Sequence, residues 1–294
     1  MKTLFVLFFS FCSVITFAQA PKPSILIVTA HPDDDALFSG AVYRITHDLG
    51  GTVDLALVTN GEGGYKYSTL GEAIYGLKLT EEAIGREHLP RIRKMELMKG
   101  GEIVGIRNYF FLDEHDVEFT TDMEVAFASH WDTTRVKQRF HRILKENKYD
   151  FIFTMLATES THGHHKGAAI LMMQVVSELP KDKRPIVLSG TMFSHEAGKP
   201  SSYSGFQGYS QTKVSSDTAF VTFDRMQKFG YNNRLNYQII GNWVIAEHKS
   251  QGSMQLLMNR GEIECYWFLD MNRSEDFKKV YTLFSNISPQ FGKK

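Results

Sequence analysis

Residues 25–35 read ILIVTAHPDDD, an apolar and mostly β-branched run that ends abruptly in a histidine, a proline and three aspartates. The apolar run is typical of a strand that is buried on both faces, as in a parallel sheet. Its polar end would lie at the carboxyl edge of the sheet, where open α/β folds place their ligand sites. Because burial of so many carboxylates is costly, we expect a cation or a substrate to interact with them.

Strands and helices are predicted to alternate along the chain as far as about residue 190. We expect strands at residues 24–30, 53–59, 109–112, 150–156 and 185–189. We expect helices at residues 35–47, 81–100, 132–147 and 166–179, and a loop at residues 65–80. This alternation favours right-handed βαβ crossovers and a three-layer α/β sandwich with a mostly parallel sheet. The irregular C-terminal extension is predicted to contain a loop at 198–216, a helix at 233–248 and a strand at 262–269.

Residues 1–20 have the features of a secretory signal peptide. Lys2 is the only charged residue, residues 4–17 are largely apolar, and residues 18–20 read AQA, a typical cleavage site. The apolar run is shorter than the roughly 20 residues that a membrane span requires. We therefore expect cleavage after Ala20, export to a periplasm or the outside of the cell, and no membrane span afterwards. The alternative is an uncleaved membrane anchor.

The composition limits the classes of partner and of metal site. Lys plus Arg and Asp plus Glu both number 33, so the net charge is near zero and no nucleic-acid partner is indicated. Only Cys265 remains after cleavage, which excludes an intramolecular disulfide and a cysteine-based zinc site. Its neighbours Glu264, Tyr266 and Trp267 indicate a strand, so we expect Cys265 to be a small buried residue instead of a nucleophile.

A histidine cluster at His162, His164 and His165 follows the strand predicted for residues 150–156. A parallel sheet would bring it to the same edge as residues 31–35. Two imidazoles and one carboxylate suit a zinc ion with an open position for water, and such a water is a usable nucleophile. A second carboxylate beside the metal can take the proton from that water. Taken alone, each segment is also compatible with a helix-capping turn or a solvated loop.

These residues resemble motifs of the PIG-L/LmbE-like N-acetylglucosaminyl deacetylase family. The sequence AHPDDD at 30–35 is similar to the family's AHPDDE motif. The later motifs T-x-G-E, R-x-x-E, H-P-D-H and A-x-H-x-S-Q are matched in order at residues 59–62, 93–96, 162–165 and 246–251. The resemblance covers about residues 24–251. It implies a Rossmann-like fold without a dinucleotide, within one domain over residues 21–294.

The resemblance also implies a role for each matching residue. It implies zinc ligands at His31, Asp34 and His165, a general base at Asp33, and a histidine that assists the intermediate or the leaving amine at His162. It implies substrate contacts at Arg93 and His248; spacing alone also allows Arg93 to be a surface residue paired with Glu96. The chain departs from the family at His164, where the motif has an acid, and at Ser160, where one branch has a tyrosine.

The resemblance implies a metal-dependent amide hydrolase that uses zinc or another divalent metal, and the signal peptide predicts that this enzyme is secreted. Its substrate would be an aminosugar or glycoconjugate that carries an N-acetyl or other N-acyl group. Two alternatives stay open: a metallohydrolase that acts on another amide or ester, and a non-catalytic glycan-binding protein with a degenerate site. Asp33 distinguishes the glycan-binding alternative from the two enzymes, because a binding protein does not require a second carboxylate beside the carboxylate that binds the metal.

Overall fold

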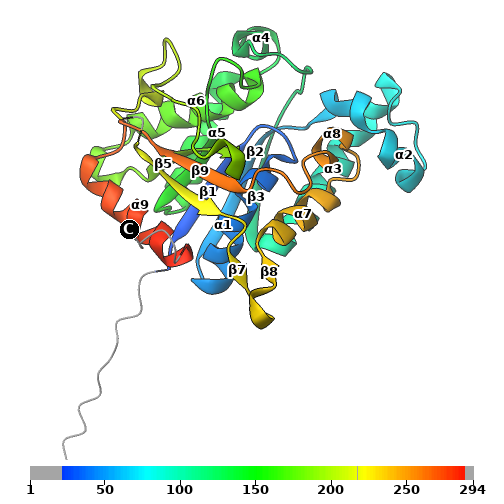
Figure 1. Ribbon diagram of the computed structural model, residues 1–294. Helices are drawn as coiled ribbons and strands as arrows, with labels where there is room; N and C mark the ends of the chain where they lie inside the picture. The colour runs from blue at the N-terminus through cyan, green and yellow to red at the C-terminus, as the bar shows by residue number, and fades with distance from the viewer. Residues whose placement is uncertain (1–21, 217, 289–294) are drawn as a thin grey trace, which may run out of the picture.

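A sheet of seven strands, in the order β3-β2-β1-β4-β5-β9-β6, forms the centre of the molecule. The computed structural model describes residues 22–216 and 218–288 (Figure 1). The first five strands of that order are parallel. They are β1 (Ser24–Thr29), β2 (Thr52–Thr59), β3 (Ile106–Glu114), β4 (Phe151–Met155) and β5 (Ile186–Phe193). The predicted α/β fold with a mostly parallel sheet is confirmed.

The C-terminal part of the chain is more regular than its sequence indicated. It adds two antiparallel strands to the sheet, β9 (Ile263–Phe268) and β6 (Phe220–Asp224), with β9 placed between β5 and β6. The short strands β7 (Lys228–Phe229) and β8 (Leu235–Asn236) form a separate hairpin that projects from the body of the molecule (Figure 1). The sheet therefore extends well beyond residue 251, where the motifs end.

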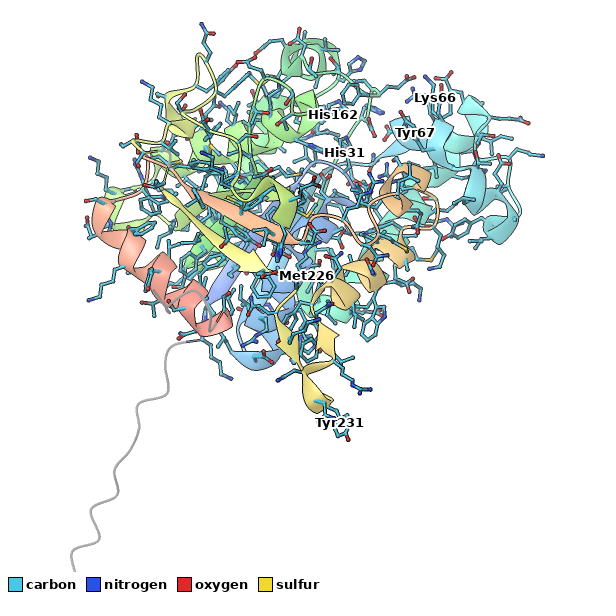
Figure 2. The ribbon with its side chains drawn as sticks, in the orientation of Figure 1. His31, Lys66, Tyr67, His162, Met226 and Tyr231 are labelled. Atoms are coloured by element: carbon cyan, nitrogen blue, oxygen red, sulfur yellow. The ribbon has the colours of Figure 1, made fainter. Side chains whose placement is uncertain are left out.

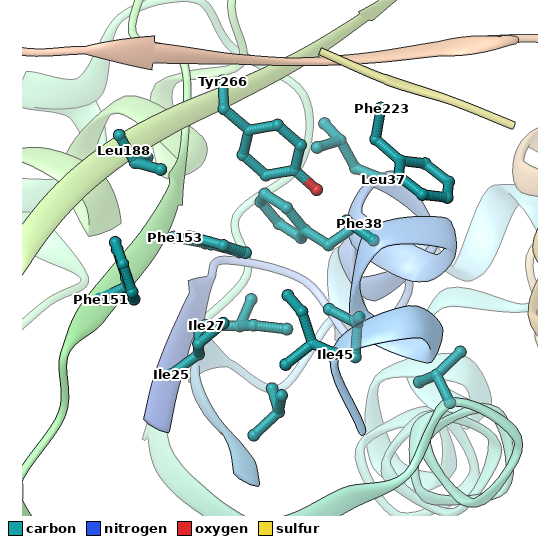
Figure 3. Packing of buried hydrophobic residues seen from close by; sticks show 14 of the residues in the cluster. Ile25, Ile27, Leu37, Phe38, Ile45, Phe151, Phe153, Leu188, Phe223 and Tyr266 are labelled. Atoms are coloured by element: carbon teal, nitrogen blue, oxygen red, sulfur yellow. The ribbon is translucent and has the colours of Figure 1, made fainter. Parts of the chain in front are cut away.

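Helices cover both faces of the sheet, and alternate residues of each central strand contact opposite layers. Along β1, Ile25 and Ile27 belong to one apolar cluster (Figure 3), whereas Leu26 and Val28 belong to the other, as the two-residue period of a strand requires. The first cluster receives side chains from α1 (Ser39–Tyr43), α3 (Glu82–Val104), α7 (Gln238–Glu247) and α9 (Phe277–Ile287). The second receives them from α4 (Met123–Ser129), α5 (Thr133–Glu146) and α6 (Gly163–Glu178).

Residues 65–80, which were expected to form a loop, are largely helical, so that prediction is wrong. The 3-10 helix η3 (Glu62–Tyr67) leads into α2 (Thr69–Tyr75), and a second short helix, α8 (Gly252–Gln255), lies later in the chain. The apolar residues Leu70 and Ile74 of α2 are 61% and 57% exposed, while Gly71 is buried. Leu70 and Ile74 point outward, whereas Tyr75 packs against the buried cluster that contains Leu79 and Leu89, so α2 buries little apolar surface of its own.

Among the residues that the structure describes, no helix combines the length and the apolar character needed to cross a bilayer. The signal peptide expected at residues 1–20 lies outside the described residues. Cleavage and export therefore stay predictions.

Candidate metal centre

The carboxyl ends of β1, β2, β3 and β4 meet at one edge of the sheet, and the candidate site lies there. The strand ends are tied together by backbone hydrogen bonds, which Thr59 donates to the Ala30 carbonyl and Asn60 donates to the Glu114 carbonyl. β1 pairs with β2 on one side and with β4 on the other, so the connection beyond it is the switch point of the sheet. This arrangement brings His31 and His162, 131 positions apart in the sequence, to a ring-centroid separation of 4.8 Å (Figure 2).

Within the described part of the chain, His31, Asp34 and His165 form one of two groups of three potential ligand residues at this edge; the other is His31, His162 and His164. His31 Nδ1 lies 2.8 Å from His165 Nε2, and His165 Nε2 lies 3.0 Å from Asp34 Oδ1. Asp34 Oδ2 lies 3.8 Å from His31 Nδ1 and accepts hydrogen bonds from the backbone N–H groups of Ala30 and His31. The backbone therefore holds one carboxylate oxygen in place while the other faces His165.

The protonation of His31 and Asp34 fits a bound divalent cation, whereas burial opposes protonation of the third member, His165, but Asp34 raises its pKa on balance. Burial and the neighbouring imidazoles lower the pKa of His31 well below its ordinary value, which leaves the ring neutral, as a metal ligand must be. Burial opposes ionisation of Asp34, but His165 and the backbone donors lower the pKa of Asp34 on balance. Two imidazole nitrogens and one carboxylate oxygen that converge in this way are a donor set typical of catalytic zinc.

Asp33 lies beside this group and has a different partner. Its Oδ1 lies 3.1 Å from Nη2 of Arg93, and Arg93 also donates to the Gly61 carbonyl. Burial raises the pKa of Asp33, and the Arg93 guanidinium opposes that rise. Arg93 is only 2% exposed, so the alternative that it is a surface residue paired with Glu96 is wrong. Glu96 is buried too, and it accepts hydrogen bonds from Ser250 and Tyr75 instead. Arg93 orients the carboxylate that was predicted to act as the base.

His162 caps the N-terminus of α6, and this role determines which of its ring nitrogens is free to act. Its Nδ1 accepts the backbone N–H of His164 at 3.1 Å. Burial and the neighbouring histidines lower the pKa of His162 to about 3, so the ring is neutral and its proton resides on Nε2. The remaining nitrogen is therefore a hydrogen-bond donor at neutral pH.

Asp116, which the sequence analysis missed, supplies a carboxylate where the motif has lost one. Its Oδ1 lies 3.4 Å from His164 Nδ1, and its Oδ2 lies 3.9 Å from His31 Nε2. His164 Nδ1 is in turn 3.0 Å from His31 Nε2. Position 164 therefore lacks the acid of the family motif, but Asp116, on the loop after β3, places a carboxylate close to the same residue. This carboxylate also faces Nε2 of His31, a predicted metal ligand. The only signal in the sequence was its place just beyond a strand end.

His248, predicted to border the substrate pocket, is instead buried behind the His-Pro-Asp turn, in contact with Asp35. It is fully buried at the end of α7, and its Nε2 is 2.8 Å from Asp35 Oδ1. Burial opposes protonation of His248, but Asp35 raises its pKa on balance. The structure therefore gives His248 a contact with the third aspartate of the motif, and a direct contact with substrate would require it to move.

These features define an α/β protein in which two histidines and an aspartate converge at the carboxyl edge of the sheet. The family described as PIG-L, GlcNAc-PI de-N-acetylase, matches residues 26–176, and the chain belongs to it. The matched residues include both the His-Pro-Asp turn and the histidine cluster.

Comparison with individual proteins agrees with this assignment. A relative from Bacillus cereus, "probable N-acetyl-alpha-D-glucosaminyl L-malate deacetylase 2", is 29% identical over 163 residues; the match covers 55% of this chain and 65% of the relative. The solved structure of the "antimicrobial reagent A40926 pseudoaglycone deacetylase Dbv21" is similar with a TM-score of 0.51 at 14% identity, over 86% of this chain and 99% of that one. A "deacetylase-teicoplanin complex" matches the same shares with a TM-score of 0.50 at 15% identity. At these identities the structural matches support the fold alone.

Proposed function

We propose that this protein is an exported, zinc-dependent hydrolase that removes an N-acetyl or other N-acyl group from an aminosugar or glycoconjugate. The observation that carries the proposal is the convergence of His31, Asp34 and His165, with the separate carboxylate of Asp33 beside them. Membership of the de-N-acetylase family and similarity to an N-acetylglucosaminyl malate deacetylase support this reaction and this class of substrate.

The proposed metal site consists of His31, Asp34 and His165. When bound, a zinc ion or another divalent metal would lower the pKa of a water molecule and polarise a carbonyl group. The second ring nitrogen of His31 faces His164 and Asp116, and such outer contacts fix the orientation of a ligand ring.

The reaction requires one proton to move from water to the leaving nitrogen. The Asp33 carboxylate accepts a proton from the attacking water, whose oxygen forms a bond with the amide carbon. Nε2 of His162 donates a hydrogen bond to the amide oxygen as negative charge develops there. The carbon–nitrogen bond then breaks, Asp33 returns the proton to nitrogen, and the products are a carboxylic acid and a free amine. Throughout, Arg93 holds Asp33 in one orientation.

Amine release and metal content of the purified mature protein, residues 21–294, test this proposal together. We expect amine, detected with fluorescamine, from glycosides of N-acetylglucosamine. The Asp33→Asn variant should keep its metal but lose about 10²- to 10⁴-fold in kcat, because general-base catalysis contributes about that much. His165→Ala should lose the metal. His141→Ala, on the outer face of α5, is a control that should change neither property.

Five results would contradict parts of the proposal. Near-stoichiometric metal in His165→Ala would refute the ligand assignment, and unchanged turnover in Asp33→Asn would refute the base. Turnover of a simple ester or an unrelated amide, with none of the aminosugar, would favour a different metallohydrolase. Glycan binding without turnover of any substrate by the parent would favour a binding protein. Recovery of the native protein from the cytoplasm alone would refute export.

A further inference from the structure

A large apolar side chain stands exposed beside the candidate metal centre. Phe119, on the loop between β3 and α4, has 70% of its surface exposed. Its ring centroid lies 5.0 Å from that of His162, and the two ring planes meet at 82°. His162 is the residue to which the proposed mechanism assigns the hydrogen bond to the amide oxygen. An exposed apolar ring is therefore in contact with a residue that faces the reacting group.

The backbone just before Phe119 has a conformation that most residues avoid. Glu118 has a φ of +107°, which glycine adopts readily but which is strained for a residue with a Cβ. The N–H group of Glu118 donates a hydrogen bond to Asp116 Oδ1 at 3.1 Å, which stabilises this turn. Strain of this kind persists only where the surrounding structure enforces it, and it is concentrated at active sites and ligand contacts. The strained turn therefore points to a functional reason for the position of Phe119.

Contacts on both sides of this exposed ring hold the loop in place. Before the ring, the Glu118 carboxylate accepts hydrogen bonds from Lys66 Nζ at 2.6 Å and from Arg86 Nη2 at 3.3 Å. After the ring, the Thr120 carbonyl accepts the N–H group of Gly163, the first residue of α6. The anchoring groups come from η3, α3 and α6, three separate elements. A ring that is held in this way can bind a ligand without the entropy loss of ordering a flexible loop.

We propose that Phe119 is a specificity-determining residue, which binds the pyranose ring of the aminosugar whose N-acyl group is removed. The inference rests on the proposed function and adds to it a preference for a cyclic sugar over an open-chain amide. A pyranose ring has an apolar face of C–H groups, and contact with an exposed phenyl ring removes both apolar surfaces from water. Such a contact adds affinity for the sugar and leaves the chemistry of the amide to the residues around it.

A cyclic and an open-chain substrate test this inference. Amine release is measured from the methyl glycoside of N-acetylglucosamine and from N-acetylserinol, which keeps the amide and two hydroxyl groups but has no ring. We expect Phe119→Ala to raise KM for the glycoside about tenfold with kcat unchanged, and to leave metal content and the kinetics of the open-chain amide unchanged. Phe119→Tyr, which keeps the ring, should behave like the parent. Tyr231→Ala is the matched control, because Tyr231 is 82% exposed at the tip of the β7–β8 hairpin, far from His31 and His162 (Figure 2).

A binding measurement separates failure of this inference from failure of the proposed function. Calorimetric titration of the glycoside into Asp33→Asn, where turnover is blocked, should show binding that Phe119→Ala in the same background weakens about tenfold. Such binding supports the inference even if the parent releases no amine, a result that would refute only the deacetylase proposal. No binding by Asp33→Asn, or equal affinity with and without the ring of Phe119, would overturn the inference. Equal losses for the glycoside and the open-chain amide would also overturn it, because Phe119 would then act through His162 or the acyl group.

Discussion

Three adjacent aspartates in the His-Pro-Asp turn have three different partners. Asp33 pairs with Arg93, Asp34 faces His165 and two backbone donors, and Asp35 pairs with His248. Three buried carboxylates in sequence would repel one another strongly, and separate partners offset that repulsion. The turn can therefore place a predicted base, a predicted ligand and an anchoring residue within one short segment.

The pair of His248 and Asp35 predicts how stability depends on pH. The pKa of His248 is raised above its ordinary value of 6.5, because the charge of Asp35, with those of Asp33 and Glu96, outweighs burial. The stabilisation is therefore complete below about pH 6.5 and is lost as the pH rises through the folded-state pKa. We expect the difference in free energy of unfolding between the parent and His248→Gln to shrink as the pH rises above about 6.5. Urea denaturation measures it, and a constant or widening gap would contradict the assignment.

Which site residues could be predicted depended on whether they belong to a motif. His31, Asp34 and His165 follow strands and match a motif, and the structure does bring them together; their roles stay predictions. Asp116 stands alone after β3, and no spacing rule connects it with His164. The burial of Arg93 could not be predicted either, because its partner Asp33 is remote in sequence and helical spacing alone does not distinguish a surface pair from a buried one.

At the scale of the element, the turn after β2 depends on a glycine. Gly61 has a φ of +73°, and a Cβ there would lie 2.4 Å from Arg93 Nη1 and 2.7 Å from Pro32 Cδ. Because Gly61 has no side chain, the Arg93 guanidinium can reach both the Gly61 carbonyl and the Asp33 carboxylate. The turn and the end of β1 are packed against each other through this one position.

Two glycine substitutions separate backbone strain from this steric contact. Gly76 also has a positive φ, +67°, but a Cβ there would have no atom within 4 Å. We expect Gly76→Ala to cost about 1 kcal/mol in free energy of unfolding, through backbone strain alone. Gly61→Ala should cost about 2–4 kcal/mol, because Arg93 must also move. Urea denaturation gives both values, and equal costs would mean that the contact with Arg93 is unimportant.

Elements with a clear apolar period were predicted, and elements shaped by distant polar contacts were not. The five parallel strands were all expected. The helix predicted for residues 35–47 is instead a succession of 3-10, α and π segments, namely η1 (Asp34–Phe38), α1 and η2 (Arg44–Asp48). The reason lies outside the segment: Glu264 accepts from the N–H groups of Gly40 and Ala41, and Arg225 donates to the carbonyls of residues 36 and 37. These contacts satisfy groups that one continuous helix would have paired internally.

At the scale of the whole molecule, a buried ion pair connects the C-terminal strands with the first motif. Arg225, just after β6, lies 2.7 Å from Glu264 of β9, and both are at most 1% exposed. Glu264 also accepts the Tyr266 hydroxyl. Neither residue belongs to a motif, and yet together they hold the backbone that follows the three aspartates.

Removal of one member of this pair should be more harmful than removal of both. Arg225→Met leaves Glu264 buried without its cation, so we expect a loss of about 3–5 kcal/mol in free energy of unfolding. In Arg225→Met/Glu264→Gln the uncompensated charge is gone, and the loss should be smaller. Denaturant titration of the two variants and the parent measures the difference. A double variant that is less stable than the single one would show that the hydrogen bonds of Glu264 outweigh its charge.

The place of β9 between β5 and β6 also determines the order in which the protein can mature during synthesis. The ribosome delivers the His-Pro-Asp turn early and Glu264 late. Until β9 emerges, β6 lacks its neighbour in the sheet, and the N–H groups of Gly40 and Ala41 lack their acceptor. A nascent chain therefore carries every predicted metal ligand long before it can hold them rigidly. The site is finished by a segment that lies far downstream of the His-Pro-Asp turn in the sequence.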